Sequence, residues 1–268
     1  MTALAAAARY ELRMQLRKPT TWIATALPFL VFALFAVLAS DSTGLRQYRY
    51  ETSPRVWMVD ALGWFTPLLP MVFGIVLADR LVRDRKLGVA PLLDVTPAGR
   101  GARLAGKYLG ACAATAVPVA LIYLGVAVAF TVWRGRPAAL LWGLATFAAI
   151  VVPLLLLVGA LSFVGPQLMP TPLFRVLVVG VWFWAGSTEV DSQLPSLAGT
   201  VLSLTMDYPL KVFFGSEGAS AGPATGAALN FLRPQPSTGA ALLSLALMLG
   251  IAAAMVAAAR ALDARTGD

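Results

Sequence analysis

Histidine is absent from this chain of 268 residues, and cysteine occurs once, at Cys112. The lack of histidine excludes haem held by paired imidazoles, histidine-based zinc sites and any nucleophile that needs a histidine base. A single cysteine forms no internal disulfide, and Cys112 stands in an apolar run, where a small buried thiol is expected. We therefore expect no catalytic residue and no metal site.

Charged residues are also scarce. They make up 13% of the chain, whereas about a quarter is usual in soluble domains, and 59% of the residues are hydrophobic. Long apolar stretches with so few charges are typical of a protein embedded in a bilayer. The net charge of +8 does not indicate a nucleic-acid partner, because Lys and Arg cluster in short segments between apolar runs, as membrane topology requires.

Six apolar stretches of helical character follow one another at residues 21–40, 57–78, 109–133, 138–164, 173–186 and 239–259. Within the external segment expected at 188–237, residues 194–215 are apolar but interrupted by two prolines, an aspartate and a lysine. Such a segment suits a hairpin that dips back into the membrane against protein. We predict an all-α integral membrane protein, one domain over 1–268, with six transmembrane helices and a re-entrant hairpin before the last span.

The basic residues indicate the orientation. With both termini in the cytoplasm, the inner flanks hold about twice as many Lys and Arg as the outer ones, in agreement with the positive-inside rule. Residues 3–18 form an interfacial amphipathic helix in this scheme, with leucines at four-residue spacing beside a basic stripe, and Pro19 ends it. The residues expected at the inner membrane interface are Arg9, Arg13, Arg17, Lys18, Arg103 and Lys107.

The stretch "GARLAGKY" at residues 101–108 begins like the phosphate-binding loop G-x-x-x-x-G-K-[ST]. Tyr108, however, replaces the hydroxyl residue that would hold magnesium, and no buried strand precedes Gly101. Gly106 and Gly110 instead form a G-x-x-x-G pattern that allows close helix packing. We predict no nucleotide site and no cofactor in this chain.

The cytoplasmic loop at 79–104 is the most informative polar segment. A charged stretch up to Lys86 precedes a break at Gly88, and an apolar tip of Leu87, Leu92 and Leu93 is rimmed by charge. A solvated connector has no need of these leucines, so we predict a docking surface for a soluble partner.

Two stretches resemble a known family. Residues 9–23, "RYELRMQLRKPTTWI", are similar to the amphipathic connecting helix of ABC exporter permeases of type 2, and residues 83–107, "RDRKLGVAPLLDVTPAGRGARLAGK", are similar to the first cytoplasmic loop of that family. The family often has glutamate where this chain has Asp84. The layout of six spans with a re-entrant hairpin before the last is also similar.

The resemblance implies a single permease domain in the bacterial plasma (inner) membrane, dimeric with a second copy or a related permease. Residues 87–95 would act as a coupling helix against a separate cytoplasmic ATPase subunit that binds the ATP. The partner-coupling residues implied are Asp84, Arg85, Leu87, Gly88, Leu92, Leu93, Thr96 and Pro97.

Two other functions fit parts of the pattern. One is a membrane scaffold that recruits a cytoplasmic partner through the same loop without transporting anything. The other is an ion-driven carrier, which would need ionisable groups within the membrane. The central parts of the six predicted spans contain no Asp, Glu, Lys or Arg, so we expect the energy for transport to enter from outside the bilayer, as in the exporter family that the chain resembles.

Overall fold

A computed structural model describes residues 2–38, 53–78, 99–187, 195–224, 226–227 and 229–265 of the chain. All regular secondary structure in these residues is helical, as predicted. The elements are α1 (Ala3–Leu16), α2 (Pro19–Leu38), α4 (Pro54–Leu77), α7 (Arg100–Arg134), α8 (Ala138–Thr146), the π-helix η1 (Phe147–Val151), α9 (Val152–Leu168), α10 (Thr171–Ser187), α11 (Asp207–Phe214), the 3-10 helix η2 (Asn230–Leu232) and α12 (Thr238–Arg265).

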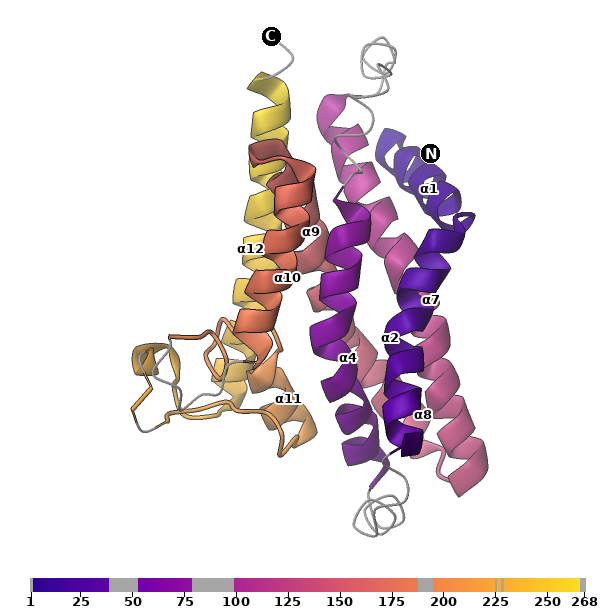
Figure 1. The fold of residues 1–268 in the computed structure, drawn as a ribbon, viewed down its shortest axis with the longest axis vertical. Helices are drawn as coiled ribbons and strands as arrows, with labels where there is room; N and C mark the ends of the chain where they lie inside the picture. The colour runs from indigo at the N-terminus through magenta and orange to yellow at the C-terminus, as the bar shows by residue number, and fades with distance from the viewer. Residues whose placement is uncertain are drawn as a thin grey trace.

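The long helices form a bundle in which the chain passes back and forth between two ends (Figure 1). Helix α1 lies tilted across one end, together with the start of α7 and the last turns of α12. We call this the α1 end. Helix α11 and the irregular segment around it lie at the opposite end, the α11 end. The N- and C-terminal helices therefore finish on the same side of the bundle.

The described residues of each of the six predicted spans fall on one pass of this bundle, the fourth being shared by α8, η1 and α9. Among the described residues, three stretches are long and apolar enough to cross a membrane: Gly101–Arg134, Ala138–Leu168 and Thr238–Leu262. Shorter apolar helices cover Pro19–Val31, Leu68–Leu77 and Thr171–Gly186. The chain is thus a helical membrane protein with several apolar helices, and the count of six crossings stays a prediction.

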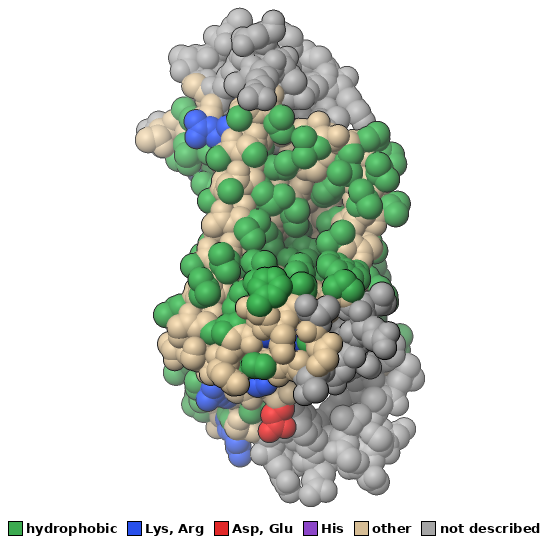
Figure 2. Space-filling view, turned by 90° about the vertical axis from the view of Figure 1, so that its left-hand side faces the viewer, with side chains coloured by type: hydrophobic (Ala, Val, Ile, Leu, Met, Phe, Trp, Pro, Cys, Tyr) green, Lys and Arg blue, Asp and Glu red, His purple; other side chains and the backbone are tan. Residues whose placement is uncertain are grey.

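The surface agrees with a membrane setting. On the face drawn in Figure 2, hydrophobic side chains cover the middle of the molecule, whereas Lys, Arg, Asp and Glu appear toward its two ends. Large apolar side chains such as Ile23, Leu121, Val176 and Leu242 are exposed on α2, α7, α10 and α12. In water such a surface would aggregate, but lipid chains cover it without cost.

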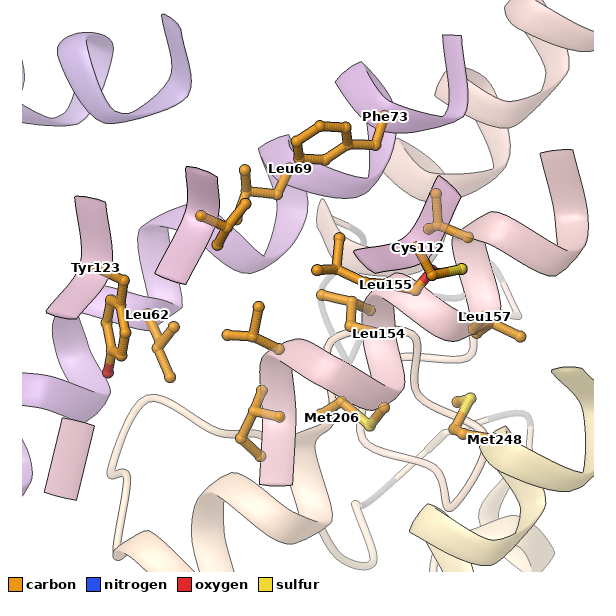
Figure 3. Close-up of a cluster of buried hydrophobic side chains, with 14 of the residues drawn as sticks. Leu62, Leu69, Phe73, Cys112, Tyr123, Leu154, Leu155, Leu157, Met206 and Met248 are labelled. Carbon is orange, nitrogen blue, oxygen red and sulfur yellow. The ribbon is translucent and has the colours of Figure 1, made fainter. Parts of the chain in front are cut away.

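The main hydrophobic core joins α4, α7 and α9 with α12 and the segment before it. Figure 3 shows Met206 and Met248 close to Leu154 and Leu157 of α9, and these four belong to one buried cluster. The thiol of Cys112 is buried in the same cluster, so the expectation of a small buried thiol is confirmed.

The fourth pass is interrupted at its centre by η1. Pro153 has no N–H to donate to the carbonyl four residues earlier, which lies within η1, and its ring crowds that turn. A π-turn, which admits one extra residue, is a common way for a helix to absorb such a defect. The pass therefore consists of two α-helices, α8 and α9, whose side-chain directions are offset by the extra residue between them.

A buried polar contact sits just before η1. The hydroxyl of Tyr123 on α7 donates to the carbonyl of Met58 on α4 at 3.0 Å and lies 2.7 Å from Thr146 Oγ1 at the end of α8. Because Tyr123 gives its proton to Met58, the Thr146 hydroxyl is the donor in the second contact. One phenol therefore connects three passes of the bundle.

Residues 195–237, which we call the cap segment, fold over the α11 end. Their described part contains α11, of eight residues, together with turns and η2. Asp207 begins α11 and accepts hydrogen bonds from the backbone N–H of Gly199, from Ser203 Oγ and from Thr205 Oγ1. This carboxylate organises the turn before α11 and also suits the positive end of the helix dipole. The predicted re-entry into the membrane stays a prediction.

Arg55, at the start of α4, fastens the cap segment to the bundle. Its Nη2 donates to the carbonyl of Phe213 at 2.7 Å, at the C-terminal end of α11, where carbonyls lack helical partners. Its guanidinium also lies over the ring of Trp142 on α8, 5.2 Å from the centroid, and that ring meets Phe214 edge to face. The cap segment, α4 and α8 are thus held by one cation.

We predict that Tyr123→Phe lowers the free energy of unfolding by about 1 kcal/mol, the usual net worth of a hydrogen bond within a membrane bundle. The loss would be measured by SDS-induced unfolding of the purified protein. Tyr10→Phe is the matched control, since Tyr10 is 71% exposed. Equal stability of the two variants would contradict a stabilising role for the buried hydroxyl.

Candidate functional site

The predicted coupling residues Asp84, Arg85, Leu87, Gly88, Leu92, Leu93, Thr96 and Pro97 lie in 79–98, outside the described residues. The structure describes the helices that flank this loop. Helix α4 ends at Leu77 and α7 begins at Arg100, both at the α1 end (Figure 1). Residues 100–104, which we assigned to the loop from the sequence, already belong to α7.

Helix α1 lies directly on the first turns of α7, at the G-x-x-x-G pattern. A Cβ atom at Gly106 would lie 2.8 Å from the carbonyl oxygen of Leu4 and 2.6 Å from Ala7 Cβ. A Cβ atom at Gly110 would lie 2.5 Å from the carbonyl oxygen of Ala8. Both distances are below any real carbon–oxygen contact of this kind, so only glycine fits. The predicted close packing is confirmed, and its partner is α1.

The face that α1 turns inward is polar, which the sequence pattern did not lead us to expect. Glu11 is 5% exposed and Gln15 is fully buried, and Gln15 Nε2 donates to Glu11 Oε1 at 2.6 Å. The four-residue row of Leu4, Ala8, Leu12 and Leu16 is instead split, because Leu4 is 37% exposed while Ala8 packs on Gly110. Two signals in the sequence could have identified this face: the alanine run at 5–8 and the second polar row at 11 and 15.

The expected basic stripe is on the open side of α1. Arg9, Arg13 and Arg17 are exposed, Tyr10 beside them is 71% exposed, and Lys18 is half-buried. Basic side chains next to an aromatic at the edge of an apolar surface are typical of a helix at a membrane interface. The helix thus combines a protein-bound face with a basic outer face.

The corner between α1 and α2 is closed by side chains. Thr21 Oγ1 donates to the carbonyl of Gln15 at 3.1 Å, and the indole N–H of Trp22 donates to the carbonyl of Leu16 at 2.8 Å. These carbonyls end α1 and have no partner within it. Because Pro19 supplies no N–H, the two side chains add to the backbone bond from the Lys18 N–H to the Gln15 carbonyl at this corner and fix the direction of α2.

The first turns of α7 also meet α12. The guanidinium of Arg260 lies against Gly101, where a Cβ atom would collide with it. Leu104, Val164 and Ala259 form a small core of their own beside this contact. Arg103 and Lys107, predicted at the membrane interface, are half-buried on the same turns. The start of α7 is therefore packed against α1 and α12 at once.

The stretch 101–108 is continuous α-helix rather than a loop. Its backbone N–H groups beyond the first turn are engaged within α7, whereas a phosphate-binding loop leaves several of them free to hold phosphate oxygens. Tyr108 donates its hydroxyl to the carbonyl of Leu156 on α9 at 2.8 Å, and its ring meets Phe163 edge to face. Tyr108 thus joins two helices in the place where a nucleotide-binding protein would have its metal-binding hydroxyl.

No cluster of three or more His, Cys, Asp or Glu side chains suited to a metal occurs within the described ranges. The packing of α1, α7 and α12 can instead be compared with known protein families. Residues 5–165, more than half of the chain, match the family described as ABC-2 family transporter protein. The chain belongs to this family. No curated protein matches it.

As an ABC-2 protein, the chain is a membrane permease subunit of an ABC transporter. The resemblance inferred from residues 9–23 and 83–107 is confirmed, and both stretches lie inside the matched residues. Members of the family generally work with a separate ABC ATPase and lack a nucleotide site of their own, which agrees with the helical conformation of 101–108. Helix α10, the cap segment and α12 lie beyond the matched residues.

We predict that Gly110→Ala lowers the melting temperature of the detergent-purified protein by several degrees, because the new methyl group forces α1 away from α7. Gly125→Ala on the same helix is the matched control, since no atom lies within 4 Å of its added methyl group. Alanine there is expected to leave stability unchanged or to raise it slightly. Equal melting temperatures for both variants would contradict the backbone contact.

Proposed function

We propose that this ABC-2 protein is the permease subunit of an ATP-driven exporter, and that a separate ATPase subunit drives it by docking on the cytoplasmic loop at 79–104. The observation that carries the proposal is the backbone contact between α1 and the first turns of α7, which directly follow that loop. A push on the loop acts on the most closely packed pair of helices at this end of the molecule.

The route of that push follows from the packing. Helix α7 has 35 residues and is about 50 Å long, whereas the hydrocarbon core of a bilayer is about 30 Å thick. It therefore projects from the membrane at the α1 end and continues, past the internal Pro118, to Tyr123 and Thr131 toward the other end. Through Tyr123 it contacts α4 and α8, and α8 carries Trp142, which Arg55 and Phe214 tie to the cap segment.

The proposed orientation places the α1 end in the cytoplasm. The exposed arginines of α1 and the basic turns of α7 would then meet the anionic inner leaflet, which attracts such groups. In this orientation the chain crosses a bacterial plasma membrane six times and has both termini inside the cell. The cap segment is then a re-entrant element on the outer side. Membrane lipid is a direct partner in this arrangement.

The remaining partners are proposed from the family. ATP is bound by the ATPase subunit and not by this chain, which needs no cofactor. The exposed apolar faces of the bundle leave room for a second permease copy, or a related permease, with the substrate path between the two. Residues 87–95 would form the coupling helix, with Asp84, Arg85 and Gly88 shaping its entry, and Thr96 and Pro97 would belong to the same partner-coupling set.

We predict that the double substitution Leu92→Asp and Leu93→Asp abolishes co-purification with the ATPase and cargo-stimulated ATP hydrolysis. Two carboxylates at an apolar docking tip would remain unpaired in the interface, at a cost of several kcal/mol. Pull-down of the ATPase and hydrolysis assays in vesicles would measure the effect.

Membrane insertion of this variant should be unchanged. The matched control is Gly218→Asp with Ser220→Asp, which adds the same charge to exposed positions of the cap segment. A loop variant that still binds and activates the ATPase would remove the docking proposal. Binding to a partner that does not hydrolyse ATP would favour a scaffold, and uptake driven by a proton gradient without ATP would favour an ion-driven carrier.

We predict that a membrane-impermeant maleimide labels Ser220→Cys on intact cells but labels Ala6→Cys only after the cells are permeabilised. Both positions are exposed, on the cap segment and on α1, and the native Cys112 is buried and gives little background. Labelling of Ala6→Cys on intact cells would reverse the proposed orientation.

A further inference from the structure

Arg233 is a buried cation within the cap segment. It is 2% exposed and follows η2 directly. The backbone on both sides of it is fixed, because the Leu232 carbonyl accepts from the N–H of Val201 at 2.9 Å and the Pro234 carbonyl accepts from the Tyr208 hydroxyl at 2.6 Å. The backbone that carries Arg233 is therefore anchored on both sides by hydrogen bonds to residues distant in sequence.

The guanidinium of Arg233 lacks partners for part of its donors. Its Nε and Nη1 atoms are both buried and have no hydrogen-bond partner among the described residues. Arginine does not lose its proton inside proteins, so burial cannot neutralise it as it would a lysine. A buried charge is normally paired, and one left unpaired is strongly unfavourable.

The carboxylate oxygens of Asp207, the acidic residue of α11, already accept hydrogen bonds from other groups. Its Oδ2 accepts from Gly199 N and Ser203 Oγ, and its Oδ1 accepts from Thr205 Oγ1. Both charged groups affect the hydroxyl of Tyr208. Burial raises the pKa of the Tyr208 hydroxyl, the positive charge of Arg233 acts in the opposite direction, and the carboxylate of Asp207 adds to the rise. Arg233 thus lies close enough to Tyr208 to influence it, but forms no ion pair with Asp207 in the described structure.

We propose that Arg233 is the binding site for one small oxyanion, a phosphate or carboxylate group, buried in the cap segment. The anion supplies the acceptors that Nε and Nη1 lack and neutralises the guanidinium. It joins the residues around η2 to α11, and so stabilises the cap segment over the α11 end. The residues of this site lie beyond those matched by the ABC-2 family, and the site does not depend on the proposed transport cycle.

The test measures the melting temperature of the detergent-purified, full-length protein in sodium phosphate and in sodium chloride at equal ionic strength. Phosphate stabilises most proteins to some extent by exclusion from their surface, so the comparison between variants is the readout. We expect phosphate at saturation to raise the melting temperature of the wild type by about 5 °C more than that of Arg233→Gln. Arg136→Gln, which removes an exposed arginine from the loop after α7, should respond like the wild type.

A second expected result separates anion binding from a purely structural arginine. In chloride alone, Arg233→Gln should be at least as stable as the wild type, because the substitution removes an unpaired buried charge. An equal phosphate response in all three proteins would overturn the proposal. Should Arg233→Gln fail to fold, equilibrium dialysis of the wild type against radiolabelled phosphate decides the matter: one saturable phosphate per chain supports the site, and no saturable binding overturns it.

The source of the oxyanion is distinguished by reconstitution. In vesicles of phosphatidylcholine alone, stabilisation by added phosphate or acetate supports a free anion. Stabilisation by phosphatidylglycerol without any added phosphate, lost in Arg233→Gln, supports a lipid headgroup. Absence of an Arg233-dependent effect in both preparations overturns the proposal.

Discussion

The contact of two helix backbones at Gly106 and Gly110 is the interaction on which the α1 end is built. Lipid exerts no hydrophobic force between helices, so their association depends on close van der Waals contact, which two glycines one turn apart provide. Helix α1 is also tied to α2 by Thr21 and Trp22. The segment before the first pass is thus part of the same rigid unit as the third pass.

Neutral hydrogen bonds connect the passes farther inside. Tyr108 reaches a carbonyl of α9, and Tyr123 reaches a carbonyl of α4 and a hydroxyl of α8. Such bonds join helices without placing charge in the lipid region, which would be costly. Charge is used instead at the α11 end, where Arg55 fastens α11 to the bundle. From the α1 end to the α11 end, the helices of the permease are therefore joined first by glycine packing, then by tyrosine hydrogen bonds and finally by an arginine.

Much of this architecture was predictable from the sequence, because apolar runs bounded by charge mark helices in a membrane protein whatever their neighbours are. The helical ranges and the buried thiol of Cys112 followed from such local patterns. The partner of Gly106 and Gly110 did not, since a G-x-x-x-G pattern allows close packing without choosing a helix. The burial of Glu11 and Gln15 did not follow either, because it depends on α7, about 90 residues away in the chain. The hydrogen bond from Tyr208 to Pro234 is likewise invisible to local patterns.

The π-turn at Phe147–Val151 has a geometric consequence for the fourth pass. One additional residue turns everything before it by about 100° relative to an uninterrupted α-helix. Trp142 and Thr146 thereby look toward α11 and the Tyr123 phenol, while Leu154 and Leu157 look into the main core. A single inserted residue therefore lets the two halves of the fourth pass pack against different partners. Its removal would rotate Trp142 and Thr146 away from theirs while Leu154 and Leu157 stayed in the main core.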